Sequence, residues 1–205
     1  ARIRMALELM GERPSPAVRA EVTRNIAELD QLIDEILLAS RLDAQEADLG
    51  SIESVDLLGL MAEECARTGA DFAPASGLHE AAVPGVAKLL RRAVRNLLEN
   101  AARYGGEQPA SATLALEAAP AGKPGQPGKG LAVIRVSDHG PGVPPELRER
   151  IFEPFYRLPG ASEREGGVGL GLALVRSIAP RLGGSVRCLA SEEGGACFEL
   201  RLPLA

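Results

Sequence analysis

The hydrophobic positions near the start of the chain follow a helical rhythm. Over residues 16–42, apolar side chains recur at intervals of four and three residues: Val22, Ile26, Leu29, Ile33 and Ile36, with Leu32 and Leu37 beside them. This spacing collects them on one stripe of a helix. Ser15 can cap the N-terminus of that helix, and Pro16 suits its first position, where a missing N–H does no harm.

A second apolar stripe lies on residues 1–10 and stops at Gly11. Two helices joined by so short a connection predict an antiparallel helical hairpin over residues 1–46. A hairpin with this much apolar surface needs a partner. Pairing with a second copy in a four-helix bundle is one solution, and packing onto the downstream part of the chain is the other.

From Ser51 onward the pattern changes to alternating strands and helices. Strands are expected near residues 51–55, 71–75, 111–117, 131–138, 185–190 and 196–202, and helices near 56–68, 85–104, 144–150 and 168–182. The Pro/Gly-rich stretch 118–130 predicts a loop between two strands. We therefore expect an α+β fold, with the strands in one sheet and the helices on one face, over residues 51–205.

Composition narrows the class of protein. The 205 residues are 45% hydrophobic and 25% charged, which is enough apolar surface for a packed core. The net charge is −5 and no block of five basic residues occurs, which argues against a nucleic-acid partner. No apolar run is long enough to cross a bilayer, so we expect a cytoplasmic piece.

Two amides and a guanidinium project together from the helix near 85–104. Asn96, Asn100 and Arg103 are spaced by four and three residues, and apolar positions occupy the opposite face. Amide oxygens can bind Mg²⁺, and an arginine can neutralise phosphates. The alternative is a solvated polar face with a Glu99–Arg103 ion pair.

A carboxylate ends the strand near 131–138. Asp138 points to the same side as Ile134 and Val136, which is the side that a core would use. Buried in this way it needs a hydrogen-bond donor, and the exocyclic amine of adenine is a suitable one. Gly140 and Gly142 would let the backbone approach a flat ring closely, although Asp-x-Gly is also an ordinary turn sequence.

A glycine cluster then leads straight into a helix. Gly167, Val168, Gly169, Leu170 and Gly171 precede a helical apolar face, and free N–H groups at a helix start bind phosphates. A flexible glycine linker is the alternative. Before the cluster, the aromatic segment 152–157 and the polar run 160–165 indicate a lid, from which Arg157 and Arg164 can reach phosphates.

Together these segments resemble the N box (Asn96, Asn100), first glycine box (Asp138 to Gly142), F box (Phe152, Phe155) and second glycine box (Gly167 to Gly171) of bacterial sensor histidine kinases. The resemblance covers residues 51–205, and residues 1–50 resemble the dimerisation and phosphotransfer hairpin of that family. It implies a two-layer α/β sandwich of the Bergerat type, shared with gyrase and the ninety-kilodalton heat-shock chaperone.

The resemblance also implies roles for single residues. Asn100 would bind Mg²⁺, with Asn96 assisting at the metal and the phosphates of ATP, and Arg103 would contact phosphate. Tyr104 would border the nucleotide, and Asp138 would recognise adenine beside Gly140 and Gly142. The phosphates would be supported by Arg164 and by the second glycine box, comprising Gly167, Val168, Gly169, Leu170 and Gly171.

Two departures from the family pattern stand out. The start of the chain resembles only the tail of the motif that carries the phosphate-accepting histidine, so we expect that histidine upstream of Ala1. Pro180 falls in the last turn of a helix that usually continues. The resemblance further implies a cognate response regulator, a homodimer through the hairpin, and a parent protein anchored in the bacterial inner membrane through segments upstream.

Two other functions compete with a histidine kinase. A clamp-type ATPase of the gyrase or chaperone kind carries a glutamate where this chain has Asn96, because a carboxylate can activate water and an amide cannot. Glu99 is a possible substitute base. A nucleotide-sensing serine-kinase regulator shares the glycine boxes, but the helical hairpin argues against it.

Overall fold

The computed structural model describes residues 15–43, 50–118, 130–158, 168–191 and 194–204. By internal contacts the chain divides into two compact units, residues 1–40 and 41–205. The predicted first helix of the hairpin lies outside the described residues, as do Arg164, Gly167 and most of the 118–130 loop. The hairpin therefore remains a prediction.

Helix α2 (Pro16–Asp43) begins where the sequence predicts. The backbone N–H of Val18 donates to Ser15 Oγ at 3.3 Å, which confirms the predicted cap. Five apolar side chains of the predicted stripe are 42% to 52% exposed: Ile26, Leu29, Ile33, Ile36 and Leu37. The predicted apolar stripe is therefore present on α2.

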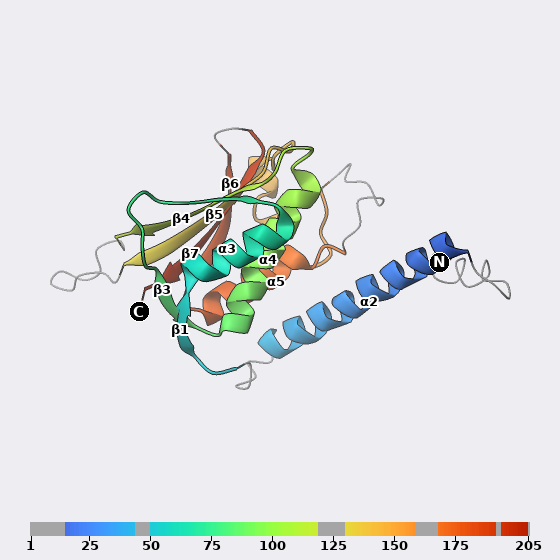
Figure 1. The fold of residues 1–205 in the computed structure, drawn as a ribbon, viewed down its shortest axis with the longest axis horizontal. Coiled ribbons are helices and arrows are strands. Elements are labelled where there is room, and N and C mark those ends of the chain that lie inside the picture. The colour runs from blue at the N-terminus through green and yellow to red at the C-terminus, as the bar shows by residue number, and fades with distance from the viewer. Residues whose placement is uncertain (1–14, 44–49, 119–129, 159–167, 192–193, 205) are drawn as a thin grey trace. The chain divides into compact units, whose positions relative to one another are not determined.

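The second unit contains a five-stranded sheet in the order β2-β4-β5-β7-β6, with helices α3, α4 and α5 over one of its faces (Figure 1). Its strands are β2 (Asp71–Pro74), β4 (Ser111–Glu117), β5 (Leu131–Ser137), β6 (Ser185–Ala190) and β7 (Ala196–Pro203). Its helices are α3 (Leu57–Thr68), α4 (Ala87–Tyr104) and α5 (Gly171–Arg181). Among the described strands of this sheet, only the β2–β4 pair is parallel. The predicted α+β two-layer fold is confirmed.

The central strand β5 shows why the two faces of the sheet differ. Ile134 lies opposite Leu200 of β7, and both side chains are fully buried between the layers. The next pair, Arg135 and Glu199, points to the other face. Glu199 is only 1% exposed there, because three arginines donate hydrogen bonds to it: Arg135 at 2.8 Å, Arg187 at 2.7 Å and Arg201 at 2.7 Å.

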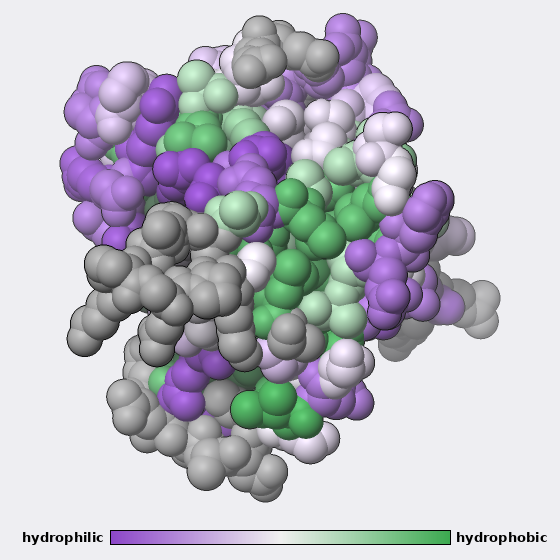
Figure 2. All heavy atoms as spheres, turned by 90° about the vertical axis from the view of Figure 1, so that its left-hand side faces the viewer, coloured by the Kyte–Doolittle hydropathy of each residue, from purple (hydrophilic) through white to green (hydrophobic). Residues whose placement is uncertain are grey.

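On the side where β4 ends and β5 begins, apolar side chains gather across the middle of the surface (Figure 2).

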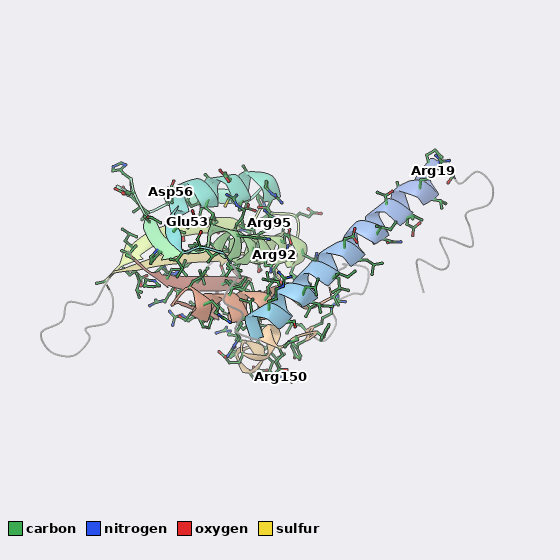
Figure 3. All side chains as sticks on the ribbon, turned by 90° about the horizontal axis from the view of Figure 1, so that it is seen from below. Arg19, Glu53, Asp56, Arg92, Arg95 and Arg150 are labelled. Carbon is green, nitrogen blue, oxygen red and sulfur yellow. The ribbon has the colours of Figure 1, made fainter. Side chains whose placement is uncertain are left out.

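Helix ends follow local chemistry. Asp56, labelled at the start of α3 in Figure 3, accepts hydrogen bonds from the N–H groups of Leu58 and Gly59. Gly69 ends the same helix in the left-handed conformation. Pro180 does lie inside α5, but the helix stops one residue later, so the missing N–H interrupts little.

Three details of the predicted fold are wrong. A further strand, β3 (Ala82–Gly85), is present that the sequence pattern does not predict. The predicted first strand, β1 (Glu53–Asp56), pairs with β3 in a separate two-stranded sheet, so the strands do not all lie in one sheet. The predicted helix near 144–150 is two short 3-10 turns, Pro145–Leu147 and Arg150–Phe152.

Candidate nucleotide-binding site

Helix α4 supplies the predicted amides, but their surroundings differ from a simple polar face. Eight of its residues are buried, and Asn96 is among them at 4% exposed. Asn100 is half-buried and Arg103 is exposed. A buried asparagine in mid-helix requires a partner. Asn96 Nδ2 donates a 3.1 Å hydrogen bond to the carbonyl of Gly171, the first residue of α5.

An ion-pair cluster fixes α4 against α3. Glu64 of α3 is fully buried and accepts hydrogen bonds from Arg95 Nε at 2.9 Å and Arg91 Nη1 at 3.0 Å. Figure 3 labels Arg95 on α4. Burial alone would raise the pKa of Glu64, but the hydrogen bonds from Arg95 and Arg91 lower it. The carboxylate is therefore charged and holds the residue next to Asn96 in place.

Asp138 follows β5 and is 3% exposed, on the side of the sheet that faces the helices. Its Oδ1 accepts two backbone hydrogen bonds, from Gly140 N at 3.0 Å and from Ala196 N at 3.1 Å. Among the described residues, no donor reaches Oδ2. A buried carboxylate with one saturated and one open oxygen can accept a hydrogen bond from a ligand amine.

Packing within the protein leaves no room for a side chain at Gly140, whether or not a ligand is bound. A Cβ added there would lie 2.1 Å from the carbonyl oxygen of Tyr104, at the end of α4. Gly105, the residue after Tyr104, would place a Cβ 3.1 Å from the Cβ of Asp138. The end of the asparagine helix and the first glycine box are therefore in direct contact. Predicted residues Tyr104, Asp138 and Gly140 do come together.

The second glycine segment meets the F-box segment through the backbone. Gly169 has φ +79°, and the N–H of Phe155 donates to its carbonyl at 2.9 Å. A Cβ at Gly169 would come within 3.0 Å of the backbone of Phe155 and Tyr156. Phe155 itself has φ +64°, rare for a side chain of its size. The two ends of the proposed lid are thus joined at its base.

The buried F-box aromatic is fixed from two sides. Phe152 packs edge-on against Phe198 of β7, with ring centroids 6.5 Å apart. The guanidinium of Arg176 of α5 lies 5.5 Å from the centroid of Phe152 and pairs with Glu149 at 2.7 Å. Of the remaining predicted residues, Val168 is exposed, Leu170 is buried, and Gly142, Arg157 and Gly171 are half-buried.

Two residues that contact Asp138 are not among the predicted site residues: Gly195, in the turn between β6 and β7, and Ala196, where β7 begins. The Gly194-Gly195 pair signals a tight turn. The signal was present, but nothing local relates that turn to a residue more than fifty positions earlier. Strand pairing brings them together, because Ser137 of β5 lies opposite Cys197 of β7.

Other candidate chemistry is not supported. Glu99 and Arg103 form no ion pair in the described part of the chain, so the ion pair suggested for the polar face of α4 is absent there. Among the described residues no group of three or more His, Cys, Asp or Glu could hold a metal ion.

The cysteines are free and buried, and burial raises the pKa of Cys65 to about 11 and that of Cys188 to about 12. No described helix is long and apolar enough to cross a membrane.

Residues 85–205 match the model of the histidine kinase-, DNA gyrase B- and HSP90-like ATPase family, and the chain belongs to that family. Curated relatives narrow the comparison. The chain is 37% identical over 99% of its length to sensor protein RstB of Escherichia coli, and 33% identical over 93% to the histidine-protein kinase/phosphatase MprB of Mycolicibacterium smegmatis. It spans 45% and 38% of their lengths, so less than half of either relative is represented.

Solved structures are also similar to this chain in fold. The mycobacterial sensor kinase MprB is 28% identical with a TM-score of 0.57, over 75% of this chain and 97% of that one. Full-length ShkA, solved in complex with AMPPNP, is 28% identical with a TM-score of 0.67, over 93% of this chain and 40% of that one. Acinetobacter baumannii AdeS, 18% identical with a TM-score of 0.71 over 98% of this chain and 93% of that one, shares the fold.

Proposed function

We propose that this chain is the ATP-binding catalytic part of a protein histidine kinase. It binds Mg-ATP between α4, the end of β5 and the start of α5, and donates the γ-phosphate to a histidine upstream of Ala1. The phosphate then passes to an aspartate of a response regulator. The sensor kinases among its relatives support this interpretation, as does the similar structure of ShkA, which was solved with the ATP analogue AMPPNP.

The observation that carries the proposal is the state of the Asp138 carboxylate. It is 3% exposed, both protein donors lie on Oδ1, and no donor among the described residues reaches Oδ2. Oδ2 can therefore accept a hydrogen bond from a ligand. The exocyclic amine of adenine is a suitable donor, and a guanine, which has a carbonyl at that position, offers none.

The residues around it fit the phosphates and a magnesium ion. The first turn of α5 carries no acidic residue, and no side chain caps its N-terminus, which leaves N–H groups for phosphate oxygens. Asn96 uses its Nδ2 on Gly171, so its amide oxygen is the atom left for a ligand. With Asn100 one turn away, two amide oxygens would be available to hold a Mg²⁺ ion. Such an ion would neutralise the charge that develops on the transferred phosphoryl group.

Binding and transfer then divide among the parts of the site. Asp138 orients the base, Tyr104 borders it, and Arg103 and Arg164 contact phosphate. The second glycine box supports the phosphates, and the lid excludes water. Dimerisation of the parent protein through the apolar stripe of α2 brings an acceptor histidine within reach. The parent protein is anchored in the bacterial inner membrane by segments upstream.

Transfer in trans tests the proposal. The chain is incubated with γ-labelled ATP and Mg²⁺, with and without a separate hairpin from the same kinase that contains the acceptor histidine. We expect acid-labile label on the added hairpin and none on this chain, because no acceptor is held in line here. A matched reaction uses Asp138→Asn, which should label the hairpin far more weakly. Label on this chain alone, or rapid release of phosphate to water, would contradict the proposal.

A further inference from the structure

The turn between β6 and β7 packs directly against the proposed adenine-binding carboxylate. Gly195 has φ +80°, and a Cβ added to it would lie 2.0 Å from the carbonyl oxygen of Asp138 and 2.6 Å from Oδ1. No side chain fits in that space. The carbonyl of Gly195 also lies against Gly142, where an added Cβ would come within 2.9 Å of it.

The next residue holds the carboxylate by hydrogen bonds. Ala196 N donates to Asp138 Oδ1 at 3.1 Å, and Asp138 N donates to the carbonyl of Ala196 at 2.9 Å. The side chain and the backbone of Asp138 are thus both fixed by the first residue of β7. Together with the bond from Gly140 N, this saturates Oδ1 and orients the plane of the carboxylate.

From this geometry we infer that Gly195 and Ala196 are positioning residues that set the selectivity of the site for a 6-aminopurine nucleotide. They act through Asp138 and do not touch the base themselves. The inference rests on the proposed function, in which Asp138 Oδ2 accepts from the exocyclic amine. A carboxylate held in one orientation favours an amine and rejects a 6-oxopurine, whose oxygen would face it.

A displaced carboxylate loses that discrimination. Gly195→Ala forces Asp138 to move, so the bond from Ala196 N lengthens and the carboxylate can rotate. ATP binding should weaken, and binding of ITP, which carries oxygen in place of the amine, should change little. The readout is the ratio of the two affinities, which a general loss of stability would not alter.

The neighbouring glycine provides a matched control. Gly194 has φ +88°, close to that of Gly195, yet an added Cβ there meets nothing within 4 Å. Gly194→Ala therefore introduces similar backbone strain without contact with Asp138. Ala196→Pro is a second test variant, since it removes the N–H that donates to Oδ1 and adds no group at Gly195.

The experiment is calorimetric titration of the full 205-residue chain and its variants with Mg-ATP and with Mg-ITP. We expect the unmodified chain to prefer ATP, and Gly195→Ala and Ala196→Pro to reduce that preference by about tenfold. Gly194→Ala should retain the preference even if its melting temperature falls. Equal affinities in the unmodified chain would overturn the role of Asp138 itself. A preference that survives in Ala196→Pro and in any folded Gly195→Ala, or that is lost equally in Gly194→Ala, would overturn this inference alone.

Discussion

The side-chain amide of Asn96 is bonded to the carbonyl of Gly171, at 3.1 Å. This bond joins the middle of α4 to the first residue of α5, so the two helices that flank the proposed phosphate site are not independent. Whatever moves the start of α5 also acts on Asn96. The side chain of Asn100, one turn along the same helix, makes no hydrogen bond to another described residue.

The first prediction uses this difference. Asn96→Asp replaces an N–H donor by a carboxylate oxygen that faces a carbonyl, in a position only 4% exposed. The free energy of unfolding should fall by roughly 1–3 kcal/mol. Asn100→Asp, at a half-buried position without that bond, should unfold almost as the original does. Urea titrations of both variants measure this, and equal stabilities would show that the Asn96 bond contributes nothing.

A second prediction concerns pH. Burial alone would raise the pKa of Glu199, but hydrogen bonds from Arg201, Arg187 and Arg135 hold it at about 2. Because the folded pKa lies below the unfolded value of about 4.3, Glu199 stabilises the fold above the unfolded value. That contribution is lost as the pH falls toward 2.

Glu199→Gln should therefore lower the free energy of unfolding at pH 7 by roughly 1–3 kcal/mol and flatten its decline between about pH 5 and pH 2. Thermal unfolding across that range follows both effects. Glu107→Gln, at an exposed position, is the control and should keep the original profile. If Glu199→Gln kept that profile too, the arginine cluster would not stabilise the fold through this carboxylate.

The third prediction separates a kinase from a clamp ATPase. With an amide at Asn96, the chain should bind Mg-ATP and release phosphate very slowly, because no carboxylate at that position can activate water. Glu99→Gln should leave the rate unchanged. A continuous phosphate-release assay suffices, and fast turnover that Glu99→Gln abolishes would place the protein among the clamp ATPases.

The fourth prediction concerns the exposed stripe of α2. Ile33 and Ile36 are 52% and 45% exposed and belong to a row of apolar side chains on α2, and contiguous apolar surface is typical of an interaction site. If the stripe pairs with a second copy, Ile33→Asp with Ile36→Asp should shift the chain toward monomer in sedimentation equilibrium. Ala20→Asp, at another exposed position of the same helix, should not. If the unmodified chain stayed monomeric at all concentrations, dimerisation through α2 would be contradicted.

Local patterns predicted most elements of the second unit because each depends on neighbouring residues. The apolar face of α4 and the alternation in β5 are examples, and the Ser15 cap of α2 is an example from the first unit. β3 was missed because a four-residue strand containing Pro84 carries almost no periodic signal. The pattern over residues 144–150 predicts a helix where the structure has two 3-10 turns, because Pro145 suits the first position of either.

The predicted site residues show the same difference between features that depend on neighbouring residues and features that depend on distant ones. Asp138 was placed correctly because strand alternation fixes its side. The burial of Asn96 was not anticipated, since it depends on a carbonyl 75 positions away. The part played by Gly195 depends in the same way on two strands meeting. The sequence shows which residue types could bind a ligand. It does not show which of them contact backbone atoms far away along the chain.

The hydrogen bond between Phe155 N and Gly169 O closes the chain on either side of the segment between them. The bond holds these two residues next to each other, so their junction with the rest of the second unit is the same whatever the length of the segment between them. The entropy of closing a loop grows slowly, by about 0.6 kcal/mol for each doubling of its length. We therefore expect insertions and deletions between these two residues to change the free energy of unfolding of the second unit very little.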